Sequence, residues 1–216
     1  ETGFVLVNAP YLLVEGFHVT GAFTAGIQVR IGSDHAVVRN NVVFSVGQRG
    51  IGVQEANDVE ITDNLAYANG TGGIQVGGLR PLVQHNTAYG NGANGIQIGV
   101  GSFASPEARV EFNITHMNGK NGMQLHDETR YPLSLPGYVA RYNLVADGYG
   151  TGTPKPATDL GLDPLFVNPS GPDGLLGGEG FADDQFHLSQ VGAGQAVNSP
   201  AVDYAPSAAR RPEVVS

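Results

Sequence analysis

The chain has 216 residues, of which 32 are glycine, 14% are charged and none is cysteine. This composition favours a turn-rich β protein, and it excludes disulfide bonds, thiol catalysis and thiolate metal sites. The net charge of −9 argues against nucleic acid as a partner. It also disfavours anionic polysaccharides, unless a local basic patch or bound cations offset it. No run of residues is long and apolar enough for a transmembrane helix, so we expect no membrane insertion.

A glycine-centred phrase recurs along the first two thirds of the chain, for example NGTGGIQVG at 69–77 and NGANGIQIG at 91–99. From Gly3 to Gly122 the aligned glycines follow one another at intervals of 22 to 27 residues. A fixed period of this size indicates a solenoid, and the short alternating segments predict two or three strands per coil. Because the first residues already follow the repeat, we expect the chain to begin inside the array. Further coils or chains could then stack at its N-terminal end.

Most of the phrases place an amide between two apolar residues, and one has glycine at that position. Side chains alternate along a strand, so the apolar residues are expected in the core and the amide on the outside. Stacked coils lie about 4.8 Å apart, so equivalent residues should form columns. The outer column is predicted to contain Gln28, Gly52, Gln75, Gln97 and Gln124.

An asparagine lies nine residues before most of the aligned glycines. These residues are predicted to form an inner ladder that bonds the corner backbone and the neighbouring coil. The ladder positions are Asn41, Asn64, Asn86, Asn113 and Asn143, with Phe17 in the first coil. Three residues further on, a column of aromatic residues either stabilises the coils or, if exposed, stacks on sugars. Its members are Phe44, Tyr67, Tyr89 and His116.

Two columns of charged residues are expected on the surface. Counting back six residues from the ladder gives the series His35, Asp58, Arg80 and Glu107, which is interpreted as a solvated ion-pair ladder. Asp63 and His85 share a second column on adjacent coils. They form either a surface pair or a poised general base, and the sequence leaves both readings open.

The pattern V-x-x-N-x-a-x-x-N-G-x-x-G-I-x-V, where a is apolar, covers about residues 3–147 and resembles the right-handed parallel β-helix proteins of the pectate-lyase-like superfamily. This resemblance implies an all-β, right-handed parallel β-helix solenoid of about six to seven coils over residues 1–147. An irregular C-terminal capping segment is expected over 148–204 and a tail over 205–216. The superfamily includes lyases, epimerases, glycosidases and non-catalytic surface proteins, so the fold leaves the function open.

The two longest connections of the repeat, within residues 95–113 and 122–143, lie on neighbouring coils. In solenoids such insertions often mark the binding face. His126 or Lys120 as a base, with Arg130 to neutralise a uronate carboxylate, would suit lyase or epimerase chemistry. The catalytic candidates are Lys120, His126, Asp127, Glu128 and Arg130, and the binding candidates are Gln97, Gln124, Tyr131, Phe103, Arg30 and Gln54.

An acidic, glycine-rich stretch follows in the capping segment. Its carboxylates are of the type that binds Ca²⁺, the one cofactor that the sequence suggests, although a solvated acidic loop explains them as well. The residues concerned are Asp173, Glu179, Asp183 and Asp184.

The sequence therefore predicts a secreted or cell-surface bacterial protein that binds or processes a polysaccharide or surface glycan. The reaction, whether of lyase, epimerase or glycosidase type, is left open. The alternative is a non-catalytic structural or adhesive solenoid section of a larger surface protein.

Overall fold

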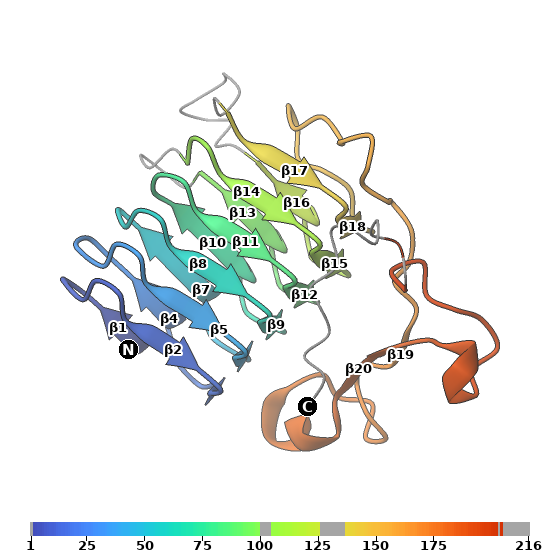
Figure 1. The fold of residues 1–216 in the computed structure, drawn as a ribbon. Coiled ribbons are helices and arrows are strands. Elements are labelled where there is room, and N and C mark those ends of the chain that lie inside the picture. Colours follow the sequence, from blue (N-terminus) through green and yellow to red (C-terminus); the bar gives the residue numbers. More distant parts are fainter. Residues whose placement is uncertain (1, 100–104, 126–136, 203, 205–216) are drawn as a thin grey trace, which may run out of the picture.

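A computed structural model describes residues 2–99, 105–125, 137–202 and 204. The repeat forms a parallel β-solenoid in which every coil contributes one strand to each of three sheets, and each sheet has six strands (Figure 1). The predicted all-β solenoid of about six to seven coils is confirmed. In the described part of the chain no helix is long and apolar enough to cross a membrane.

We name the three sheets A, B and C in the order in which the chain visits them. Sheet A contains β1 (Thr2–Leu6), β4 (Ala25–Val29), β7 (Arg49–Gln54), β10 (Ile74–Gly77), β13 (Ile96–Ile98) and β16 (Met123–Gln124). Sheet B contains β2 (Leu13–Glu15), β5 (Val37–Arg39), β8 (Glu60–Thr62), β11 (Leu82–Gln84), β14 (Arg109–Glu111) and β17 (Val139–Arg141). Sheet C contains β3 (His18–Val19), β6 (Val42–Phe44), β9 (Leu65–Tyr67), β12 (Thr87–Tyr89), β15 (Ile114–His116) and β18 (Leu144–Val145).

The core is a set of apolar columns that run along the solenoid axis. In sheet A the parallel register aligns Ile27 with Ile51, Ile51 with Ile74 and Ile74 with Ile96. These four side chains are completely buried. The alternation of apolar and amide residues in the phrase thus sets which side of each strand faces inward.

The predicted asparagine ladder is confirmed. Each amide nitrogen donates to the side-chain oxygen of the next rung, for example from Asn64 Nδ2 to Asn86 Oδ1 at 3.0 Å. The same nitrogen donates to backbone carbonyls at the corner, such as Val38 O at 2.9 Å. All five predicted asparagines are buried. The ladder therefore supplies partners for corner groups that water cannot reach.

A second ladder, which the sequence analysis missed, runs along the next corner through Asn69, Asn91 and Asn118. Successive rungs are joined by bonds of 2.9 Å from the amide nitrogen to the next oxygen. Both ladders end on an aspartate, since Asn118 donates to Asp147 and Asn143 donates to Asp159. A final asparagine would have an N–H group with no further rung to accept it. A carboxylate has only acceptors, so it matches this position.

The corners require a left-handed backbone. The residue before each ladder asparagine has a positive φ, which is 57° at Asp63 and 54° at His85. The predicted charged column occupies another such corner, with φ of 54° at Asp58 and 52° at Arg80. Asp58 and Arg80 form a bidentate ion pair at 2.7 Å, as the ion-pair interpretation expects.

The C-terminal segment first closes the last coil and then runs back along the outside of sheet C (Figure 1). Tyr149 and Leu160 make parallel bridges to Met123 and Leu144 of the last coil. Beyond them lie β19 (Phe166–Asn168), the 3₁₀ helix η1 (Gly178–Asp183), β20 (Gln185–Leu188) and the 3₁₀ helix η2 (Val191–Ala193).

This returning segment covers the predicted aromatic column. The rings of Phe44 and Tyr67 stack at 5.1 Å, and Phe181 and Phe186 pack over them at 4.7 and 4.8 Å. Phe44, Tyr67 and Tyr89 are buried as a result. Of the two readings of the column, the structure supports stabilisation, because the rings are not exposed to a sugar.

Candidate functional site

The predicted site residues divide into two groups. Arg30, Gln54, Gln97, Lys120 and Gln124 belong to the described residues and lie on or beside sheet A. The remaining candidates outside the acidic loop, namely Phe103, His126, Asp127, Glu128, Arg130 and Tyr131, lie outside the described residues.

Amide side chains line the outward face of sheet A. Asn94 donates to Gln97 at 3.2 Å, and in the next coil Asn121 donates to Gln124 at 3.3 Å. Asn121 also donates to Asn94 at 3.1 Å, so the two coils share one amide network. The alternation correctly predicted the outward direction, but Gln28 and Gln124 are only 5% and 7% exposed. Gln28 Nε2 donates to Gly52 O at 3.3 Å, and the backbone at Gly150 lies directly against the Gln124 amide.

The glutamine column is interrupted at Gly52, and Arg49 occupies the gap. A Cβ atom at position 52 would lie 2.8 Å from Arg49 Cδ and 2.9 Å from Gln28 Oε1. From there the guanidinium reaches the next coil, where Nη1 donates to Gln75 Oε1 at 3.4 Å. The arginine therefore joins the amide row in the coil that lacks a glutamine. We call this row the sheet A row. Its members are Gln28, Arg49, Gln75, Asn94, Gln97, Asn121 and Gln124.

Arg30, Gln54 and Lys120 flank the sheet A row. Arg30 directly follows β4 and is exposed, while Gln54 ends β7 and pairs in register with Gly77. Lys120 is exposed in the turn that leads into β16, where its backbone N–H donates to Ala93 O. Burial, together with the charge of Arg30, lowers the pKa of the Arg49 guanidinium.

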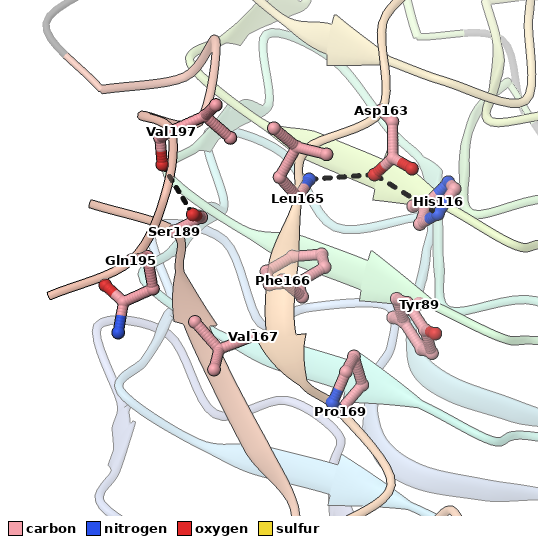
Figure 2. A pocket seen from close by; sticks show the side chains of 10 residues that line it. All are labelled: Tyr89, His116, Asp163, Leu165, Phe166, Val167, Pro169, Ser189, Gln195 and Val197. Atoms are coloured by element: carbon pink, nitrogen blue, oxygen red, sulfur yellow. Dashed lines mark hydrogen bonds and ion pairs between the residues drawn. The ribbon is translucent and has the colours of Figure 1, made fainter. Parts of the chain in front are cut away.

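Figure 2 shows a pocket of about 390 Å³ between sheet C and the returning segment. His116 lies at one end between two carboxylates, with Nδ1 3.9 Å from Asp147 Oδ1 and Nε2 3.7 Å from Asp163 Oδ1. Burial, reinforced by both carboxylates, raises the pKa of Tyr89 beside them. The other walls are mostly apolar and include Phe166 of β19. This pocket has the size of a small-molecule site, and its polar end brings Asp163 of the returning segment close to His116 of sheet C.

A buried carboxylate on sheet B was also missed by the sequence analysis. Glu111 is 1% exposed and accepts from Arg141 Nε at 2.6 Å and from Arg109 Nη2 at 2.9 Å. The Gln84 amide also donates to it. Glu111 is in register with Gln84 on one side and Arg141 on the other, so the cluster joins three coils. Since the charge of Glu111 is fully paired, we assign this cluster a role in the stability of the fold.

Among the described residues no group of three or more His, Asp or Glu side chains is placed to hold a metal ion, and the side chain of Glu179, one of the predicted ligands, is not among them. Asp173 accepts from the backbone of Leu175, and Asp184 accepts from Tyr67 Oη at 2.7 Å. Asp183 accepts from the backbone N–H of Asp173 at 3.3 Å. These aspartates thus have roles in loop structure and in docking of the segment.

Comparison with protein families matches residues 1–80 to the family described as the right handed beta helix region. The same three-strand coil continues from there to β18, so the described coils form a right-handed parallel β-helix. No curated protein and no solved structure matches the chain.

Proposed function

We propose that this protein binds a polysaccharide along the sheet A row, outside the cell or at its surface. The observation that carries the proposal is the continuity of the row, which follows the solenoid axis from Gln28 to Gln124. Primary amides both donate and accept hydrogen bonds, as sugar hydroxyls do. Their repetition about every 4.8 Å suits an extended polymer better than a single small molecule.

The proposal is restricted to binding. Two carboxylates about 5–9.5 Å apart would be needed to flank a glycosidic bond. The described outward positions of sheet A from β4 to β16 carry amides, glycine and arginine, and no carboxylate. Lyase, epimerase or hydrolase activity would draw on the predicted acid–base candidates, which are Lys120 and those at 126–131.

A second candidate function is a purely structural solenoid. It is favoured by the burial of Gln28 and Gln124 and by the bond from Gln28 Nε2 to the backbone of Gly52 at 3.3 Å. In that case the row would stabilise coil stacking in the same way as the inner ladders, and no ligand would bind.

Co-sedimentation with insoluble polysaccharides, followed by calorimetry with soluble oligosaccharides, separates the two candidates. We expect Gln75→Ala and Gln97→Ala, at half-buried positions of the row, to weaken binding at least about fivefold. Gln84→Ala, on sheet B, is the matched control and should bind like the parent. Failure of every neutral and acidic polysaccharide to bind the parent protein would leave the structural solenoid as the function. Release of reducing ends or unsaturated products would extend the proposal from binding to catalysis.

A further inference from the structure

The described arginines fall into two classes. Arg39, Arg80, Arg109 and Arg141 each lie within 2.9 Å of a carboxylate oxygen. Arg30 and Arg49 form no ion pair with any described carboxylate, although the chain has 20 acidic residues and only 11 basic ones. The two arginines without a carboxylate lie on neighbouring strands of sheet A, since Arg30 directly follows β4 and Arg49 begins β7.

The environment of Arg49 is unfavourable for a cation in the absence of a ligand. Its guanidinium is half-buried, and its Nε is buried with no acceptor among the described residues. The one described acceptor is the neutral oxygen of Gln75 at 3.4 Å. A buried donor without an acceptor costs free energy, as does a second positive charge nearby. Fold stability alone therefore does not explain this pair.

Glycine at position 52 makes room for this arrangement. A Cβ atom there would collide with Arg49 Cδ and Gln28 Oε1, so glycine leaves room for Arg49 to pass over position 52. The guanidinium then presents several N–H donors in a planar fork, a geometry that fits the oxygens of a carboxylate or a sulfate. Arg30, which is exposed and directly follows β4 in the preceding coil, adds a second positive charge.

We propose that Arg30 and Arg49 form a subsite for an acidic group of the bound polysaccharide, a carboxylate of a uronic acid or a sulfate ester. This inference rests on the proposed function, because it specifies the chemistry of the polymer that the sheet A row binds. The arginine pair is a local basic patch of the kind that a chain of net charge −9 needs to bind an acidic polymer.

The test compares ligands that differ only in charge. Calorimetry on the full chain uses an oligogalacturonate and its methyl ester for the carboxylate, and sulfated and unsulfated malto-oligosaccharides for the sulfate. We expect one acidic form to bind at least about tenfold more tightly than its neutral partner, in line with charge-assisted hydrogen bonds. The preference should weaken as salt is raised. Arg30→Gln and Arg49→Gln should each remove it, whereas Arg39→Gln, which makes the same charge change on sheet B, should keep it.

The outcomes distinguish the two proposals. Equal binding of acidic and neutral forms, or a preference that survives both substitutions, refutes the subsite and leaves polysaccharide binding intact. If no saccharide binds, polysaccharide binding fails, and titration with inorganic sulfate then tests the arginine pair by itself. If sulfate raises the thermal unfolding midpoint more than chloride does, and Arg30→Gln removes this difference, the arginine pair is an anion site without a polymer. If sulfate gives no such increase, the anion site is refuted. Arg30 is exposed, so its variant keeps the test valid if Arg49→Gln fails to fold.

Discussion

Replacing Asn64 by alanine removes one rung of the first asparagine ladder. The side chain donates to Val38 O, Thr62 O and Asn86 Oδ1 at 2.9–3.0 Å. Its oxygen accepts from the backbone and side-chain nitrogens of Asn41 at 3.1 Å. The Asn41 side chain keeps Val14 O and Arg39 O as acceptors, but its backbone N–H loses the acceptor that the ladder supplies.

The free energy of unfolding should fall by about 2–4 kcal/mol. An orphaned buried donor costs about 1–3 kcal/mol, and the lost bonds to the corner carbonyls add to this. Asn121→Ala is the matched control, because it removes two outer-face bonds from a half-buried side chain that water can reach. We expect the control to cost less than about 1 kcal/mol.

Urea unfolding followed by circular dichroism measures both variants, with the slope m checked for constancy so that the midpoint reports stability. If Asn64→Ala were no more destabilised than Asn121→Ala, the inner ladder would not be a source of stability. The argument for both ladders would then fail.

Three further perturbations test other parts of the structure. Truncation after Gly148 should cause aggregation, because it exposes the β edge of the last coil and the rings of Phe44 and Tyr67; a soluble monomer would contradict this. Asp159→Asn should lower the urea midpoint by the equivalent of about 1–3 kcal/mol, because an N–H group replaces a carboxylate oxygen that accepts from Asn143. An unchanged midpoint would contradict the role of Asp159 as the last acceptor of the ladder. Burial, together with Asp184 and Asp159 respectively, raises the pKa values of Tyr67 and Tyr149, so both stay neutral in the folded state. Stability should therefore be unaffected below about pH 10, where unfolded tyrosine ionises, and fall above it by about 1.4 kcal/mol per pH unit for each residue. Tyr67→Phe and Tyr149→Phe should each flatten that slope in urea midpoints between pH 8 and 11, and an unaltered slope would refute the assignment.

The pocket beside His116 lies where the C-terminal segment packs against sheet C. Asp163 of that segment lies 3.7 Å from His116 Nε2, and Asp184 accepts a hydrogen bond from Tyr67 Oη. Between these points the aromatic column supplies apolar contact. The segment is thus held by both polar and apolar contacts over several coils, and it closes the last coil as well.

The sequence by itself determined the solenoid and the first ladder. A period set by the recurring glycine requires each residue to stack on its equivalent, so identical residues become columns without any long-range information. The second ladder is visible in the same repeat as the asparagine of each Asn-Gly pair, namely Asn69, Asn91 and Asn118. Its burial, however, depends on where the backbone turns the corner.

Only the tertiary structure decided the features in which side chains cross between columns. Alternation places Arg49 on the same side as Ile51 and Val53, so the sequence gives no reason to expect its guanidinium over Gly52. The aromatic column was consistent with either a sugar site or a stabiliser, until a segment more than 100 residues away was seen to cover it. A repeat fixes contacts between equivalent residues, because those contacts follow from the period. Contacts between a coil and a non-repeating segment follow no period, and they arise only when the chain folds back on itself.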